Sequence, residues 1–315
     1  QRQMCIRDRS YKYYQPEGGN EATDDDRYNA MKLAADNGAK VIVAAGFMQG
    51  NALAVAAAEF TDVKFVFIDG WSLGLDNLAG ISFKEEQCGY LAGYAAVMDG
   101  YTKLGFTGGG DGGNAACNRY GYGFVQGADA AAKELGITVD MKYAYGNQFF
   151  GDADITAVMD TWYAAGTEIV FACGGGIYTS AAEAAKKVGG KVIGVDTDQS
   201  PVINAAFGDG ITVTSAMKGL APTTIDTLVD VVINGKWADY AGKIDTLGLV
   251  SGDDASLNYV QLPVASTQFA DGKFTEADYA ALVKGMFDGT VKVSADTSVE
   301  PTVTNVNVTY QDQIA

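Results

Sequence analysis

The sequence predicts an α/β protein in which two lobes each contain a doubly wound, mainly parallel sheet. Short apolar runs alternate with longer helical segments, which is the pattern of strand–helix–strand units. This alternation occurs twice, with a junction near residues 100–104, so the two halves look like two copies of one design. Glycine and acidic residues follow several apolar runs, and ligands of such sheets bind outside the carboxyl ends of the strands.

In the first half, apolar and aromatic runs mark the strands and alanine-rich segments mark the helices. We expect strands at 11–16, 40–45, 64–68 and 78–83, and helices at 26–37, 52–60 and 88–100. The strand at 40–45 leads into Gly46 and Phe47, and the strand at 64–68 leads into Asp69. Both strand ends therefore carry candidate ligand contacts.

The second half repeats the alternation. We expect strands at 103–106, 137–145, 169–172, 191–196 and 210–215, and helices at 122–135, 153–165, from 179, at 223–233 and at 276–287. The last 25 residues look extended and weakly structured.

Residues 166–199 form the most informative strand–loop–helix–strand unit of the chain. An apolar run meets three glycines, Gly174 to Gly176, and the next apolar run ends at Asp196. The N–H groups of the glycine loop and the Asp196 carboxylate would then face one crevice. Alternatively, the glycines only turn the chain and Asp196 only caps a loop, and the residues alone leave both interpretations open.

Two further residues at strand ends carry charge. Asp196 and Asp198 would suit an acid/base pair or metal ligands, but alternate residues at a strand end point to opposite sides. One carboxylate that accepts two hydrogen bonds from vicinal hydroxyls is simpler chemistry, so we expect Asp198 to be structural. Lys218 follows another strand, and it is either a solvated lysine or a ligand contact.

A G-x-G-x-x-G motif (Gly108, Gly110, Gly113) follows the strand at 103–106. A dinucleotide site needs a helix that starts at the third glycine and an acid at the end of the next strand. Residues 114–122 precede the expected helix, and Tyr-Gly-Asn, without an acid, ends the next strand. We therefore favour a hinge or cleft-lining loop over a dinucleotide site.

Composition excludes several classes of function. The 315 residues include no histidine, which excludes Ser-His and Cys-His pairs and imidazole metal sites. The four cysteines are widely spaced, so we expect small buried thiols rather than zinc or a redox dithiol. The formal charge of −17 disfavours binding to nucleic acid or anionic membrane. We expect no cofactor, no metal and no catalytic residue, and hence not an enzyme.

Several segments together resemble the basic membrane protein family, the PnrA-like nucleoside-binding components of ABC transporters. The resemblance covers about residues 11 to 290. The segments that resemble the family are 34–47, 64–70, 83–96, 118–128, 169–178, 191–199 and 213–219. The most specific are GVDTDQ, at the end of 191–199, and TSAMKG, at the end of 213–219. It implies a type I periplasmic-binding-protein clamshell, whose two lobes are joined by three crossovers. Lobe 1 would comprise residues 11–102 and 217–246. Lobe 2 would comprise residues 103–216 and 247–315, and the second of these ranges includes the C-terminal tail.

The resemblance also implies a function and a site. The protein would be a monomer that binds a purine-type nucleoside outside the cytoplasmic membrane and presents it to an ABC permease. Asp196 would accept hydrogen bonds from the ribose hydroxyls, and Lys218 would contact the ligand from the hinge side. The remaining implied contacts are Gly174, Gly175 and the aromatic Tyr178, with Gly46, Phe47 and Asp69 from the first lobe.

The N-terminus departs from the family pattern. The family begins with a strand and a helix ahead of residues 11–16, and here residues 1–10 stand in their place. We interpret residues 1–10 as an artefactual leader and expect a truncated copy that has lost the lipoprotein signal and its anchoring cysteine.

Two alternatives stay open at this point. One is a sugar or autoinducer receptor of the same fold, and the other is a nucleoside- or sugar-processing enzyme that uses Asp196 and Asp198.

Overall fold

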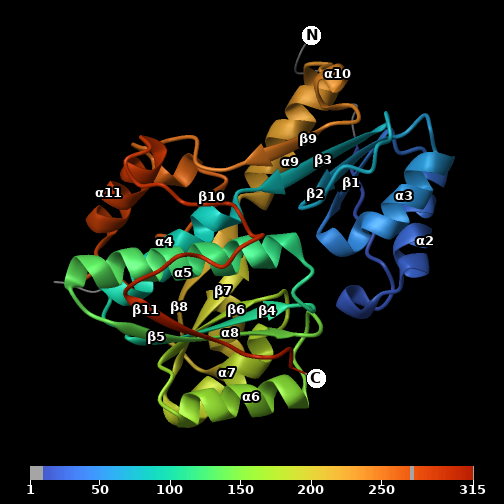
Figure 1. The fold of residues 1–315 in the computed structure, drawn as a ribbon. Helices are drawn as coiled ribbons and strands as arrows, with labels where there is room; N and C mark the ends of the chain where they lie inside the picture. Colours follow the sequence, from blue (N-terminus) through green and yellow to red (C-terminus); the bar gives the residue numbers. More distant parts are fainter. Residues whose placement is uncertain (1–9, 270–272, 315) are drawn as a thin grey trace. The chain divides into compact units, whose positions relative to one another are not determined.

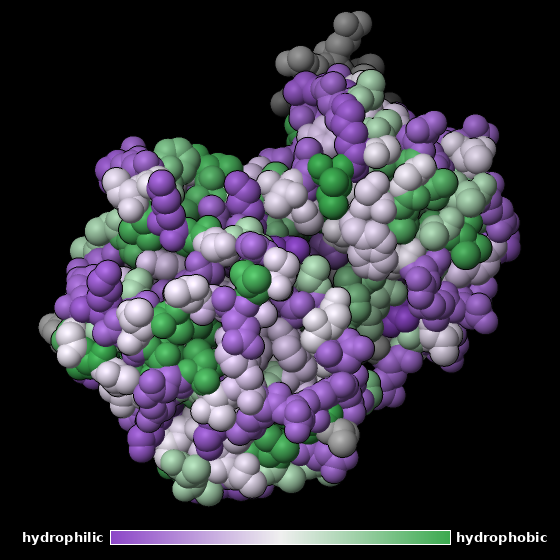
Figure 2. Space-filling view, in the orientation of Figure 1, coloured by the Kyte–Doolittle hydropathy of each residue, from purple (hydrophilic) through white to green (hydrophobic). Residues whose placement is uncertain are grey.

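The computed structural model describes residues 10–269 and 273–314, and within it the chain forms two α/β units (Figure 1). Unit 1 contains the chain up to Ser82 and the segment Ala221–Thr246, and unit 2 contains Phe83–Leu220 and the chain from Leu247 onward. The chain therefore passes between the units three times, as a type I clamshell requires. On the face shown in Figure 2, hydrophilic residues are spread over both units and hydrophobic residues form separate patches.

Unit 1 is built on a four-stranded sheet with the order β1-β2-β3-β9. Its strands are β1 (Val41–Ala45), β2 (Lys64–Ile68), β3 (Leu78–Phe83) and β9 (Ile244–Leu247). Its helices are η1 (Gly19–Glu21), α2 (Asp24–Asp36), η2 (Phe47–Gln49), α3 (Gly50–Glu59), α9 (Leu220–Leu228), the π-helical η3 (Val229–Ile233) and α10 (Trp237–Tyr240). β1 and β2 pair in parallel, as do β2 and β3.

Local signals explain the helices of unit 1. Thr23 and Asp26 form a capping box at the start of α2, which satisfies N–H groups that have no partner within the helix. Small residues of α3 pack with Phe65 and Phe67 of β2, and all of them are buried in one apolar cluster. That cluster fixes β2, and with it the position of Asp69 at the strand end.

Unit 2 is built on a seven-stranded sheet with the order β10-β8-β7-β6-β4-β5-β11, in which only the short β10 runs antiparallel to its neighbour. Its strands are β4 (Lys103–Gly109), β5 (Val139–Gly146), β6 (Ile169–Cys173), β7 (Lys191–Asp196), β8 (Thr212–Lys218), β10 (Val260–Gln261) and β11 (Val306–Tyr310). Its helices are α4 (Glu85–Met98), α5 (Ala115–Leu135), α6 (Ala153–Ala164), α7 (Tyr178–Val188), α8 (Ser200–Phe207), η4 (Ala255–Leu257) and α11 (Glu276–Phe287).

Helix α4 belongs to unit 2, whereas the expected lobe boundary lies near residues 100–104. The physical reason is its packing against α5. A side chain on Gly93 of α4 would come within 2.1 Å of the Phe124 carbonyl oxygen, and one on Gly127 of α5 within 2.1 Å of the Tyr90 carbonyl oxygen. The two helices are thus in backbone contact, which only glycine allows at these positions.

Four sequence expectations about secondary structure need correction. Residues 11–16 are not a strand, because no strand of the described chain pairs with them, and Tyr11 and Tyr13 are exposed. Helix α5 begins at Ala115 rather than Tyr122, so Gly121 and Gly123 lie inside the helix. The helix α8 was not expected, and the C-terminal tail contributes β11 to the sheet. No helix of the described chain is long and apolar enough to cross a membrane.

Candidate functional site

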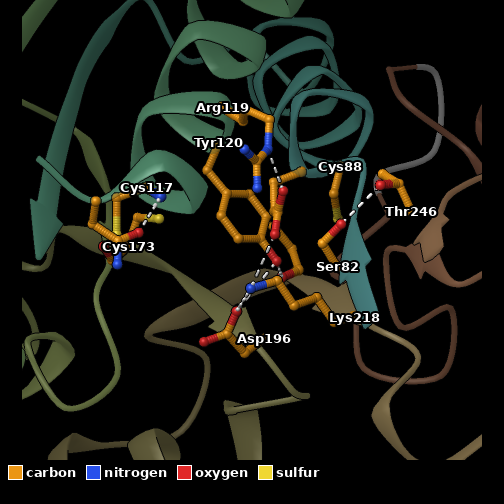
Figure 3. Close-up of polar contacts among 12 residues, drawn as sticks. Ser82, Cys88, Cys117, Arg119, Tyr120, Cys173, Asp196, Lys218 and Thr246 are labelled. Carbon is orange, nitrogen blue, oxygen red and sulfur yellow. Dashed lines mark hydrogen bonds and ion pairs between the residues drawn. The ribbon is translucent and has the colours of Figure 1, made fainter. Parts of the chain in front are cut away.

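The polar residues Asp196 and Lys218 lie at the ends of two adjacent strands of unit 2. Asp196 is the last residue of β7 and Lys218 the last of β8, and the two strands pair in parallel with Asp196 opposite Met217. The Lys218 Nζ atom is 3.1 Å from Asp196 Oδ1, so the two side chains form an ion pair at this edge of the sheet (Figure 3). About a third of the Asp196 side chain remains exposed (35%).

Asp196 has an unusual backbone conformation. Its φ is +64°, and Asp69 at the end of β2 has a φ of +62°; these are the only non-glycine residues of the described chain with positive φ. Aspartate tolerates the left-handed region better than most residues, but the conformation is still strained. Such strain concentrates at functional sites, and here it falls on the predicted acid of each unit.

Lys218 is buried, although it was predicted to contact the ligand. Only 2% of its side chain is exposed, and its Nζ atom is also 3.4 Å from Oε1 of the fully buried Glu85. The ammonium lies 5.2 Å from the ring centroid of Tyr120 and 5.8 Å from that of Phe83, within cation–π range. The lysine thus sits between two carboxylates and two aromatic rings.

A second ion pair extends this arrangement. Arg119 Nε is 2.6 Å from Glu85 Oε2; Arg119 lies in the second turn of α5, and Glu85 is the first residue of α4 (Figure 3). Sequence reasoning did not find Glu85, because the acid stands in an expected loop between Phe83 and the predicted helix at 88–100. The four charged groups sum to zero formal charge, which suits a buried cluster.

Tyr120 completes the cluster from α5. Its hydroxyl lies 3.1 Å from the Ala216 carbonyl oxygen and 3.4 Å from Asp196 Oδ1, so it donates to one or the other. Burial, and next the charge of Asp196, raise the pKa of this hydroxyl well above its usual value. Tyr120 therefore stays protonated and acts as a hydrogen-bond donor beside Asp196.

The predicted glycine loop follows β6 and is held against β7. Gly174 has no room for a side chain, because a Cβ atom would come within 2.7 Å of the Gly109 backbone. Gly175 has a φ of +55° and is exposed. Gln199 donates from Nε2 to the Gly175 carbonyl oxygen and accepts from the Val195 N–H, so one side chain joins the loop to β7.

Two other sequence candidates have structural contacts. Tyr178 starts α7 and is partly buried against the apolar cluster of unit 2 that contains Ile177 and Ala181. Asp198 accepts from the N–H and the hydroxyl of Ser200 at the start of α8, as expected for a structural residue. Asp196 and Asp198 thus engage different partners and do not converge on one reacting atom.

The predicted residues of unit 1 share one edge of its sheet. Gly46 follows β1 and Asp69 follows β2, and the pairing of Ala45 with Ile68 brings these two strand ends together. Gly46 has a φ of +97°, and its N–H donates to the Ile68 carbonyl oxygen. Phe47 starts η2 directly after Gly46 and is half-buried.

Two of the cysteines, which are far apart in the sequence, lie together in unit 2. The Cys117 thiol donates to the Cys173 carbonyl oxygen at 3.4 Å (Figure 3). Burial, and next a hydrogen bond with the Cys117 side chain, raise the pKa of the Cys173 thiol well above its usual value. Cys88 is also buried, while Cys5 lies outside the described residues. The described thiols are thus packed side chains, and no described group of three or more Cys, Asp or Glu residues is placed to hold a metal ion.

Comparison with known proteins identifies relatives of this chain. The family model described as ABC transporter substrate-binding protein PnrA-like matches residues 5–252. The chain is 28% identical to the ABC transporter nucleoside-binding protein BmpA of Lactococcus lactis, over 84% of this chain and 77% of that protein. It is 31% identical to Basic membrane protein D of Borreliella burgdorferi, over 72% of this chain and 67% of the relative.

Solved structures support the fold. A solute-binding protein of an ABC transporter system from Conexibacter woesei superposes with a TM-score of 0.63 at 20% identity, and covers 88% of this chain and 86% of its own. A corresponding protein from Aeropyrum pernix gives a TM-score of 0.61 at 18% identity, over 86% of this chain and 76% of its own. The described units therefore have the fold of type I periplasmic binding proteins.

Proposed function

The chain belongs to the PnrA-like family of ABC transporter substrate-binding proteins, and from this premise we propose that its ligand is a purine nucleoside. Members of this family bind small molecules outside the cytoplasm, work with a membrane permease and are not enzymes. The finer assignment to a nucleoside is supported by the L. lactis relative, which is named a nucleoside-binding protein.

The observation that carries the proposal is the Asp196 carboxylate. It stands at the carboxyl end of β7, partly exposed, with a strained backbone and with Lys218 and Tyr120 on its inner side. A carboxylate held in this way accepts two hydrogen bonds from neighbouring hydroxyls, such as the 2′- and 3′-hydroxyls of a ribose. Gly174 and Gly175 would then line the ligand next to Asp196, and an aromatic residue such as Tyr178 or Phe47 would pack on the base.

The remaining contacts would come from Gly46, Phe47 and Asp69 of unit 1, since their strand ends present an equivalent edge. Lys218 would act through Asp196 from the hinge side rather than reach far into the solvent. The protein would be a lipid-anchored monomer that delivers the nucleoside to its permease.

A thermal-shift screen against adenosine, guanosine, inosine, cytidine, ribose and adenine tests the ligand class. We expect purine nucleosides to stabilise the protein by about 2.7 kcal/mol at 100 times their Kd, with little effect of ribose or adenine. The variant Asp196→Asn should lower the affinity about 10- to 100-fold, because hydrogen bonds to a charged acceptor contribute about 1.5–3 kcal/mol each.

The matched control is Asp198→Asn, which changes the same side chain two residues further along the chain. Because the hydrogen bonds of Asp198 within the described chain go to Ser200, this variant should keep the nucleoside response. Stabilisation by pentoses with no response to nucleosides would instead favour a sugar receptor of the same fold. An Asp196→Asn protein that binds nucleosides like the wild type would contradict the assigned contact.

A further inference from the structure

Four charged side chains form one line in unit 2, which we call the charge chain: Arg119, Glu85, Lys218 and Asp196. They come from α5, α4, β8 and β7, and the successive ion-pair distances are 2.6, 3.4 and 3.1 Å (Figure 3). The exposure of the side chains changes along the line. The two central ones are 1% and 2% exposed, whereas the terminal ones are 27% and 35% exposed.

The buried centre of the charge chain cannot meet a ligand itself. Glu85 and Lys218 are both buried, and the rings of Tyr120 and Phe83 lie against the Lys218 ammonium. Buried charges are tolerated only when they are paired, since removal from water costs several kcal/mol for each ion. Glu85 Oε1 makes no hydrogen bond within the described residues. The negative charge of this oxygen is therefore compensated by the nearby Lys218 ammonium.

The Lys218 ammonium is therefore shared between an inner and an outer carboxylate. The inner one, Glu85, is held by Arg119 and cannot turn away, whereas the outer one, Asp196, is partly exposed. Because the ammonium also interacts with Glu85, it orients the Asp196 carboxylate while neutralising only part of the negative charge of that carboxylate. If Glu85 were neutral, the ammonium would lose one of its anionic partners, would interact more strongly with Asp196, and would compete more strongly with ligand hydroxyls for that carboxylate.

We propose that Glu85, supported by Arg119, is a positioning residue that sets how strongly Asp196 binds the vicinal hydroxyls of the ligand. This inference rests on the proposed function, because it concerns the same carboxylate. Glu85 acts through Lys218 and touches no ligand atom. Its effect is therefore confined to the part of the affinity that depends on the ribose hydroxyls.

The test compares a purine nucleoside with its 2′,3′-dideoxy analogue, which lacks both hydroxyls, by isothermal titration calorimetry. In the wild type we expect a preference for the nucleoside of about 100-fold, from two hydrogen bonds to a charged acceptor. In Glu85→Gln we expect this preference to fall to about 10-fold or less, while the affinity for the dideoxy analogue stays nearly unchanged. A merely structural role would instead weaken both ligands by the same factor.

The neighbouring Glu86→Gln is the matched control. Glu86 is also a buried acid in the first turn of α4, but it has no ion pair with Lys218. This variant should keep the wild-type preference. If Glu85→Gln keeps it as well, or loses both affinities in proportion, the inference is overturned.

Two further measurements distinguish a failure of the proposed Asp196 contact from a failure of the inference about Glu85. A wild type without preference for the nucleoside over the dideoxy analogue refutes the proposed contact of Asp196 itself, and with it the inference. If Glu85→Gln does not fold, Arg119→Gln decides, because the Arg119 side chain is more exposed than that of Glu85. A preference reduced several-fold supports the positioning of Asp196 through Glu85, and an unchanged preference contradicts it.

Discussion

At the scale of single residues, the two left-handed aspartates place both predicted acids in the same local geometry. Asp69 and Asp196 each follow a strand of their unit, and each turns the chain at the point where the next segment leaves the sheet. In a non-glycine residue this conformation costs roughly 1–2 kcal/mol, less for aspartate. Asparagine also tolerates a positive φ, so Asp196→Asn tests the charge of the side chain rather than the backbone conformation.

Glu86 makes a prediction about stability. Its Oε2 atom is buried without a hydrogen-bond partner among the described residues, and burial raises its pKa above the usual value of 4.5. A carboxyl whose pKa is raised by folding stabilises the protein fully below its unfolded pKa, and that contribution is lost as pH rises through the folded pKa. Neutral pH therefore forces an ionised, poorly solvated group into the fold.

We expect Glu86→Gln to be more stable than the wild type by about 1 kcal/mol at pH 7, since the glutamine carries no charge to desolvate. This advantage should shrink as pH falls through the raised pKa toward 4.5 and disappear below it. Urea unfolding at several pH values measures the difference. Glu276→Gln, an exposed acid in the first turn of α11, is the control and should change little. A difference that does not depend on pH would contradict the assigned cause.

Only part of the site could be predicted from the sequence. Asp196 and Lys218 follow apolar runs, so their location at strand ends is visible in one dimension. Glu85 and Arg119 are distant from them in the chain and meet them only because α4 and α5 pack together. No spacing rule contains that information, because the contact depends on tertiary packing.

At the scale of secondary structure, the contact between α4 and α5 determines where Glu85 and Arg119 lie. Each helix presents two glycines four residues apart, Gly89 and Gly93 on α4 and Gly123 and Gly127 on α5. A Cβ atom at any of them would approach a carbonyl oxygen of the other helix to 2.0–2.1 Å. These four glycines are therefore positions of close helix packing. Local propensity was overridden by tertiary contact, which is why the start of α5 was predicted too late.

Gly93→Ala should destabilise the protein by about 3 kcal/mol, because the added methyl group must push the helices apart. Urea unfolding measures the effect, and an unchanged m-value shows that the same surface still unfolds. The control is Gly285→Ala on α11, where the nearest atoms are side-chain atoms at 3.2 and 3.3 Å. That variant should be neutral or slightly stabilising, since alanine favours the helix by about 1 kcal/mol. Equal stabilities of the two variants would contradict the close packing of α4 and α5.

The strand pattern was predicted well because apolar runs are buried on both faces in a parallel sheet. β2 and β3 have the predicted bounds, as does the helix α11. The strand expected at 11–16 was wrong. Its aromatic residues favour a strand, but no described strand pairs with this segment. β11 was missed for the opposite reason: a polar, exposed sequence becomes a strand when β5 offers an edge.

At the scale of the whole molecule, three chain crossings join the two units, each of which contains one sheet. The crossings fall at 82/83, 220/221 and 246/247. Two of them lie on the adjacent strands β3 and β9, where the Ser82 and Thr246 hydroxyls are 2.8 Å apart. A movement of one unit relative to the other would therefore need dihedral changes near these three crossings.

We expect saturation with a purine nucleoside to lower the radius of gyration, which is about 20 Å for a compact chain of this length. The predicted contacts come from both units, with Asp196 from one and Asp69 from the other, so a ligand that binds to both favours the closed state. Small-angle X-ray scattering with and without the nucleoside measures the change. Asp196→Asn at the same ligand concentration should keep the ligand-free radius. Calorimetric saturation of the wild type with no change in radius would mean that one unit holds the ligand alone, and would contradict a site that needs both strand edges.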